Sequence, residues 1–183
     1  MEGRSLGIMC SYNAVNGVPS CANDWLLKDT LRGSWDFDGY VTSDCGAVND
    51  VCNPVAKGGH GYTATCANAS ALSVQAGTDG DCGGVSKGGI PAAVSGGLLT
   101  EAEVDVSFGR LTTVQMRLGL FDAGKGAPFF DLGAEAIDTP AHRQLAYEAA
   151  QQTVVLLKNA LLKNDRPTLP FKPGGKVAVV GPH

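Results

Sequence analysis

A short apolar strand that ends on a carboxylate and a thiol is the feature of this sequence best suited to chemistry. Residues 39–45 read Gly-Tyr-Val-Thr-Ser-Asp-Cys, so the β-branched run stops at Asp44 and Cys45. In a parallel α/β sheet the body of such a strand is buried, and the residue at its carboxyl end faces the ligand crevice. Asp44 is therefore a candidate nucleophile. The alternative is that its carboxylate only caps the turn or helix that follows.

Two other segments have a similar shape, and each of them contains a cysteine. Residues 7–13 read Gly-Ile-Met-Cys-Ser-Tyr-Asn, and residues 77–83 read Gly-Thr-Asp-Gly-Asp-Cys-Gly. Cys45 and Cys82 each end a predicted strand, and neighbouring strands of a sheet lie about 4.8 Å apart. Because a disulfide tolerates Cα–Cα separations of about 4.4–6.8 Å, we predict a bridge between these two cysteines.

The cysteine pattern favours disulfides over a metal site. The chain has six cysteines and no CxxC pair, which indicates an oxidising compartment rather than zinc binding; six buried free thiols are the alternative. Once Cys45 and Cys82 are paired, the other four are left as two local pairs, Cys10 with Cys21 and Cys52 with Cys66. Asp79 and Asp81 do not form a calcium loop, because the required Gly and Glu are out of place.

Alternating strand and helix patterns predict an α/β organisation. The expected strands are residues 6–12, residues 39–44, a strand end at 78–82 and a buried strand at 176–181. The expected helices are residues 23–31 with Asn23 or Asp24 as cap, residues 69–76, residues 100–118 with a Thr100–Glu103 capping box, and a helix that runs from Thr139-Pro140 to Lys158-Asn159. Residues 49–68 are expected to form a long loop on the side where the strands end, and the Gly-rich residues 121–138 a linker.

The composition gives no reason to expect nucleic acid or a membrane as a partner. The formal net charge is −4, which does not favour a polyanionic surface, and no apolar run approaches the roughly 18 residues of a membrane span. The first residues contain no apolar signal-peptide region. Gly83-Gly84 and Gly88-Gly89 do not follow the order of a phosphate-binding loop, and we expect no cofactor.

Five sequence motifs resemble those of glycoside hydrolase family 3, in particular of its β-xylosidase branch. They are MCSYNAVNGVPSCA, GYVTSDCGAV, AGTDGDCG, LTTVQMRLGLF, and LLKN followed by KVAVVGP. The resemblance implies that residues 1–120 are the last three β/α units of a (β/α)8 barrel. Residues 121–139 would then be a linker, and residues 140–183 the start of an α/β sandwich domain. Three of eight units leave an open parallel edge, so we expect an incomplete fragment whose partner is the remainder of its own chain.

The same resemblance implies roles for the candidate residues. Asp44 would be the nucleophile of a retaining glycosidase, which also needs a second carboxyl as acid and base. Met9 and Tyr12 would line the sugar pocket, with the Tyr12 hydroxyl reaching the nucleophile or the sugar; Met9 as core filler is the alternative. His60 lies in the loop over the barrel mouth and would touch substrate, unless it is simply solvated. In the family the acid/base is a Glu of the second domain, beyond the end of this sequence.

The predicted bridge suggests which sugar is bound. A Cys45–Cys82 disulfide beside Asp44 would narrow the pocket where a hexose carries its C6 hydroxymethyl group, which xylose and arabinose lack. Many glucosidases of the family have a Trp directly after the Asp, where this chain has Cys45. We therefore expect a secreted β-xylosidase acting on xylo-oligosaccharides or aryl xylosides, with α-L-arabinofuranosides as a further candidate substrate class. The alternatives are a β-glucosidase of the same family and a truncated remnant without activity.

Overall fold

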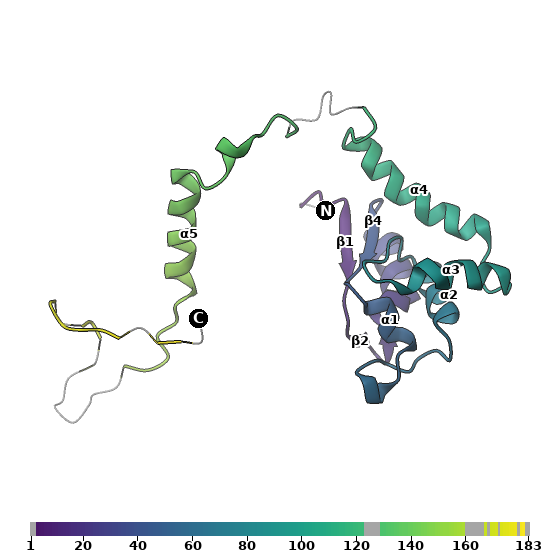
Figure 1. Ribbon diagram of the computed structural model, residues 1–183, viewed down its shortest axis with the longest axis horizontal. Helices are drawn as coiled ribbons and strands as arrows, with labels where there is room; N and C mark the ends of the chain where they lie inside the picture. The colour runs from purple at the N-terminus through teal and green to yellow at the C-terminus, as the bar shows by residue number, and fades with distance from the viewer. Residues whose placement is uncertain are drawn as a thin grey trace. The chain divides into compact units, whose positions relative to one another are not determined.

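The protein forms two compact units, Met1–Phe130 and Asp131–His183 (Figure 1). A computed structural model describes residues 3–122, 129–159, 167, 169–171, 173–178 and 180–181. Each unit is considered by itself below. The first unit carries every residue that the sequence singles out for chemistry.

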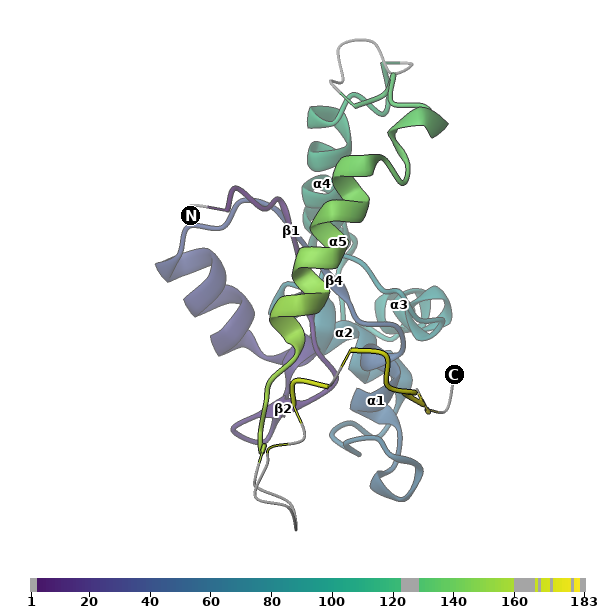
Figure 2. The ribbon, with the colours of Figure 1, turned by 90° about the vertical axis from the view of Figure 1, so that its left-hand side faces the viewer.

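Two short parallel strands form the centre of the first unit. β1 (Gly7–Cys10) pairs in parallel with β4 (Tyr40–Ser43), and the two run side by side (Figures 1 and 2). On the other side of β4, Thr42 forms a single parallel bridge with Gly80. The strands predicted at 6–12 and 39–44 are therefore confirmed over their central residues.

The strand end expected at 78–82 is reduced to that one bridge. The Asp79 carboxylate, and not a backbone carbonyl, accepts the Val41 N–H at 2.9 Å. The amides of Asp79 and Gly80 both donate to the Val41 carbonyl, at 2.7 and 3.0 Å. A side chain thus takes the place of a ladder hydrogen bond, and the pairing cannot extend along the segment.

Helices follow both strands and lie on one side of the pair (Figure 1). After β1 come the hairpin β2 (Ala14–Val15) and β3 (Val18–Pro19), the short turn η1 (Ser20–Ala22) and the π-helix η2 (Trp25–Ser34). After β4 come α1 (Ala47–Cys52), η3 (Val55–Lys57), α2 (Cys66–Ala76), α3 (Val85–Ser95) and α4 (Glu101–Arg117). This parallel pairing with intervening helices is of the α/β class.

Local signals placed three of these helices correctly. The helix expected at 23–31 is η2, and Asn23 caps it, because its Oδ1 accepts the Leu26 N–H at 3.1 Å. The helix expected at 69–76 is the later part of α2. The capping box predicted for 100–118 is confirmed: Thr100 accepts the Glu103 N–H, and the Glu103 carboxylate accepts the Thr100 N–H.

Two parts of the first unit differ from the expectation. The loop predicted at 49–68 is wrong at both ends, because α1 continues to Cys52 and α2 already begins at Cys66. The sequence predicts neither the β2–β3 hairpin nor α3. Helix α3 contains two glycines and Pro91, which are unfavourable inside a helix. Packing explains α3: a Cβ on Gly89 would lie 2.1 Å from Ser70 Oγ of α2, so glycine lets the two helices approach closely.

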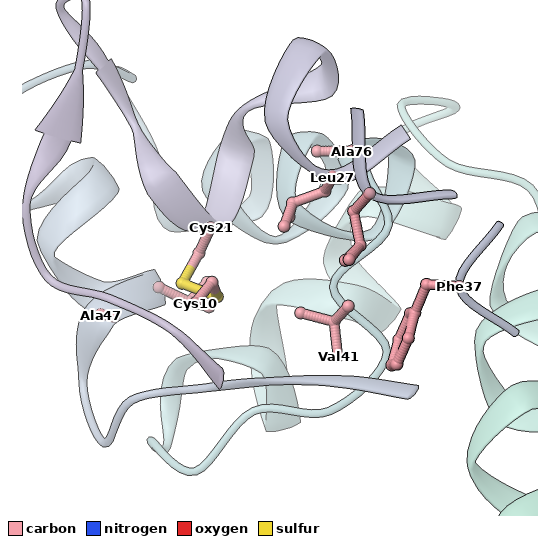
Figure 3. Close-up of a cluster of buried hydrophobic side chains, with 9 residues drawn as sticks. Cys10, Cys21, Leu27, Phe37, Val41, Ala47 and Ala76 are labelled. Atoms are coloured by element: carbon pink, nitrogen blue, oxygen red, sulfur yellow. A yellow bond between two sulfur atoms is a disulfide. The ribbon is translucent and has the colours of Figure 1, made fainter. Parts of the chain in front are cut away.

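The core of the first unit lies between the strand pair and the helices (Figure 3). It consists of Cys10, Cys21, Leu27, Leu31, Phe37, Val41, Ala47, Val48 and Ala76. Side chains of β1 and β4 alternate between this core and the opposite face. Cys10 and Val41 are buried against the helices, whereas Met9 on the opposite face is 57% exposed. The face of the strand pair that carries Met9 is thus open in this unit, and Asp44 directly follows β4.

The second unit contains one long helix, α5 (Pro140–Thr153). Thr139 caps it by accepting the His142 N–H at 3.2 Å, and Pro140 occupies the first turn, as predicted. The helix ends at Thr153, four residues before Leu157, and the apolar residues 154–157 are exposed. Residues 123–128 of the expected linker lie outside the described residues. Within the described part of 176–181, which omits Val179, no strand is formed, because a parallel strand needs a neighbour to complete its hydrogen bonds.

Across these described segments, no helix combines the length and hydropathy needed to cross a membrane.

Candidate active site

Asp44 lies directly after β4, at the carboxyl end of the parallel pair. Its backbone N–H donates to the Cys10 carbonyl of β1 at 2.9 Å, which ties it to the neighbouring strand. Its Oδ1 accepts the Cys45 N–H at 2.7 Å, and Gly46, with φ +94°, turns the chain into α1. The carboxylate is partly exposed. The residue is thus fixed by backbone contacts on both sides while its side chain remains accessible.

Tyr12 brings a hydroxyl to the same place from the end of β1. The hydroxyl donates to the Cys45 carbonyl at 2.5 Å. Burial of this hydroxyl, its hydrogen bond with Asp44 and the charges of Asp44 and Asp50 raise the pKa of Tyr12. Tyr12 therefore keeps its proton at neutral pH and can donate a hydrogen bond beside the carboxylate. The structure brings Tyr12 and Asp44 together.

His60 also reaches this region, although its side chain contacts the protein backbone. Its Nε2 lies 2.7 Å from the Tyr12 carbonyl oxygen. Met9 lies on β1, three residues before Tyr12, opposite Thr42 in the register and on the open face of the pair. The four residues expected at the site from β1, β4 and the loop therefore lie near one end of the strand pair.

The predicted Cys45–Cys82 disulfide is confirmed, with a Cα–Cα separation of 4.4 Å. The two local pairs, Cys10–Cys21 and Cys52–Cys66, are also formed. All six cysteines are therefore used, and none is free. The Cys45–Cys82 bridge begins at the residue after Asp44, whose carboxylate accepts the Cys45 N–H.

Asp81, which sequence reasoning treated only as part of a failed calcium motif, holds Cys82 in place. Ser43 Oγ donates to Asp81 Oδ1 at 3.0 Å and accepts the Cys82 N–H at 3.0 Å. Burial alone would raise the pKa of Asp81, but hydrogen bonds from the N–H groups of Gly83 and Ser86 and from the side chains of Ser86 and Ser43 outweigh it. The pKa of Asp81 therefore lies below its usual range, and Asp81 is ionised at neutral pH.

Asp79 is a second residue whose role the sequence did not indicate. Its side chain is fully buried and accepts bonds from Arg32 at 2.6 Å and Arg110 at 3.0 Å, in addition to the Val41 N–H. These contacts join η2 and α4 to β4, the strand that leads to Asp44. The two strand-end acids thus differ: Asp79 is buried between two arginines, whereas Asp44 is partly exposed.

Neither Glu103 of the capping box nor Glu135 of the linker has the raised pKa of a general acid. Bonds from Thr100 lower the pKa of Glu103, and backbone bonds at Glu135 and Gly133 lower the pKa of Glu135. A general acid needs the opposite shift. In the part of the chain that the structure describes, no group of three or more His, Cys, Asp or Glu residues could hold a metal ion.

Comparison with known proteins gives one family. The model of the glycosyl hydrolase family 3 N terminal domain matches residues 2–114. Beta-D-xylosidase 1 of Arabidopsis thaliana is 45% identical over 184 residues, which cover 100% of this chain and 22% of that protein. The probable exo-1,4-beta-xylosidase bxlB of Aspergillus clavatus is 44% identical over 179 residues, which cover 96% of this chain and 22% of that protein.

Solved structures give the same picture. A GH3 exo-beta-xylosidase (XlnD), in complex with a xylobiose aziridine activity based probe, has a TM-score of 0.75 at 41% identity, over 92% of this chain and 21% of that chain. A beta-glucosidase from Listeria innocua in complex with glucose has a TM-score of 0.71 at 30% identity, over 87% of this chain and 21% of that chain. The chain spans about a fifth of the length of these relatives.

Proposed function

Because this chain belongs to glycosyl hydrolase family 3, we propose that it is part of a retaining β-xylosidase that removes xylose from xylo-oligosaccharides. The observation that carries the proposal is the arrangement around Asp44. An accessible carboxylate follows β4, a protonated tyrosine lies beside it, and a disulfide starts at the next residue. A retaining glycosidase needs such a carboxylate close under the anomeric carbon.

The chemistry runs in two steps. Asp44 attacks the anomeric carbon as the bond to the leaving-group oxygen breaks, which gives a covalent glycosyl ester. Water then cleaves this ester, and the sugar leaves with its original anomeric configuration. The Tyr12 hydroxyl, which donates its single proton to the Cys45 carbonyl in the unliganded site, would turn that proton toward the Asp44 carboxylate or the sugar when substrate is bound. The second carboxyl, which protonates the leaving group and later activates water, comes from a Glu elsewhere in the longer polypeptide.

The substrate class follows from the disulfide. In this proposal the Cys45–Cys82 bridge, which begins beside the nucleophile, narrows the sugar pocket, and a pentose is favoured because it has no C6 hydroxymethyl group. Relatives named as xylosidases, at 41–45% identity, support this choice. A β-glucosidase is the second candidate, supported by the likeness to the Listeria innocua enzyme at 30% identity. Met9 lines the pocket on the open face of β1.

The remainder of the polypeptide is the partner that this site needs. We assign residues 1–120 to the last three units of a (β/α)8 barrel, 121–139 to a linker and 140–183 to the start of an α/β sandwich domain. Two apolar surfaces are exposed in the described residues: the open face beside Met9 and residues 154–157. In the longer polypeptide, other segments would cover them. The three disulfides favour secretion of the whole protein. The 183-residue chain alone would be inactive.

The proposal is tested by replacing Asp44 in a chain extended to the length of its relatives. Asp44→Asn keeps the size of the side chain and removes the charged nucleophile, so turnover of an aryl β-xyloside should fall by about a thousandfold or more. Asp50→Asn is the matched control, because Asp50 is the other carboxylate whose charge reaches Tyr12. Unchanged turnover in Asp44→Asn, or an equal loss in both variants, would contradict the assignment.

A further inference from the structure

The loop between α1 and α2 is tied down at both ends and in the middle. Its flanking residues form the Cys52–Cys66 disulfide, which spans 14 residues. Inside the loop, the N–H groups of His60 and Gly61 donate to the carbonyls of Asp50 and Asn53, both at 2.7 Å. The Tyr62 N–H donates to the Val51 carbonyl at 2.9 Å. The backbone at His60 is therefore held against α1, which fixes the position of the His60 Cα atom.

From this fixed position the His60 side chain contacts the backbone of Tyr12. The Tyr12 carbonyl can only accept a hydrogen bond, so the His60 Nε2 at 2.7 Å must carry a proton. The neutral ring with its proton on Nε2 and the charged ring both meet this condition. The contact joins residues 48 positions apart in the sequence. It therefore links the loop to the segment that follows β1.

The described contacts fix the residues on either side of Tyr12, and His60 supplies the contact at the Tyr12 carbonyl itself. Tyr12 lies beyond the last residue of β1 and is 46% exposed. The neighbouring Asn13 is tied to Ser20, whose N–H and hydroxyl both donate to the Asn13 carbonyl. The Tyr12 hydroxyl donates to the Cys45 carbonyl. Desolvation is the largest cause that raises the pKa of Tyr12, and the Asp44 carboxylate lies close enough for its charge to raise that pKa further. A shift of the Tyr12 backbone would move that hydroxyl away from Asp44.

We infer that His60 is a positioning residue: through its Nε2–H bond to the Tyr12 carbonyl, it holds the Tyr12 hydroxyl beside Asp44 and does not grip the sugar. The inference deepens the proposed function and depends on Asp44 being the nucleophile. The loop between Cys52 and Cys66 is then a fixed support of the site. His60→Gln keeps an amide N–H near the place of Nε2, whereas His60→Ala removes the donor.

The test is a double-mutant cycle in the extended chain, read as the rate of covalent labelling by a xylobiose aziridine and as kcat/KM for an aryl β-xyloside. His60→Ala should lower both by about tenfold to a hundredfold, the usual effect of a misplaced catalytic geometry, mainly through kcat. His60→Gln should recover most of the loss. In a Tyr12→Phe background, His60→Ala should cost less than about twofold more, because its effect passes through the missing hydroxyl.

The control is Tyr62→Phe, in the same loop, which should leave labelling unchanged. Multiplicative losses in the double mutant, or a His60→Ala effect confined to KM, would overturn the inference and indicate sugar contact. If Asp44→Asn still labels, the proposed function fails; if Asp44→Asn is silent and His60→Ala labels normally, only this inference fails. For a poorly folding His60→Ala, ¹⁵N NMR of the His60 ring decides: a proton on Nε2 supports the inference, and a neutral ring protonated on Nδ1 overturns it.

Discussion

Replacing Asp79 by Ala should destabilise β4 far more than the loss of an exposed ion pair at a similar distance. The Asp79 side chain has no solvent exposure and accepts from Arg32, whose side chain is 14% exposed, and from Arg110, at 30%. The exposed pair Arg117–Asp38 has an N–O distance of 3.0 Å, with side chains 47% and 68% exposed. The Asp79 and Asp38 ion pairs thus have similar N–O distances and differ mainly in how deeply their side chains are buried.

The magnitude follows from this difference in burial. A pair of unit charges about 4 Å apart at an effective dielectric constant of about 20 attracts by roughly 4 kcal/mol, and desolvation cancels much of that gain. Removing one partner of a buried pair costs about 3–5 kcal/mol, because the desolvated charge is left behind. Without Asp79, the Arg32 and Arg110 guanidinium groups also repel each other. In the folded protein, burial is the main cause that lowers the pKa of Arg32, and the charge of Arg110 lowers it further. The exposed Asp38→Ala change should cost less than about 1 kcal/mol.

Amide hydrogen exchange across residues 40–43 is the assay, because the Val41 N–H bonds directly to Asp79. A loss of about 3 kcal/mol in the free energy of opening accelerates exchange by about a hundredfold or more. Asp79→Asn should lie between the wild type and Asp79→Ala, since it keeps an acceptor and loses the charge. Equal exchange in Asp79→Ala and Asp38→Ala would refute the reasoning.

Three further predictions concern the site. The first-formed sugar should be the β anomer by NMR, as retention requires; an initial α anomer excludes Asp44 as nucleophile. Replacing Cys45 and Cys82 together by Ala should raise the glucoside-to-xyloside ratio of kcat/KM, and an unchanged ratio rules out the steric account. Folding lowers the pKa of Asp81. The carboxylate therefore stabilises the folded state fully above its unfolded pKa of about 3.9, and this stabilisation is lost as the pH falls through its pKa in the folded protein. Asp81→Asn should therefore flatten the acid limb of a stability curve measured by urea unfolding, and an unaltered limb would show that Asp81 does not contribute.

The sequence alone determined the features that depend on local geometry. A β-branched run has one buried body and one carboxyl end, so Asp44 could be placed at the end of β4 from the residues themselves. The Cys45–Cys82 bridge followed from the strand spacing, and the structure confirms it. The Thr100–Glu103 box was readable because its partners lie three residues apart. The roles of Met9 and Tyr12 at a sugar remain predictions that rest on the family.

Tertiary structure decided what depends on partners distant in the sequence. Asp44 and Asp79 both lie near the ends of apolar segments, yet Arg32 and Arg110, 47 and 31 residues from Asp79, make that residue a buried anchor. His60 looked like a loop residue facing substrate, but the Tyr12 carbonyl lies within reach of its Nε2. Helix α3 formed against its Gly and Pro content because Gly89 packs on Ser70. In each case a non-local hydrogen bond or contact outweighs the local preference, and such contacts exist only once the chain has folded.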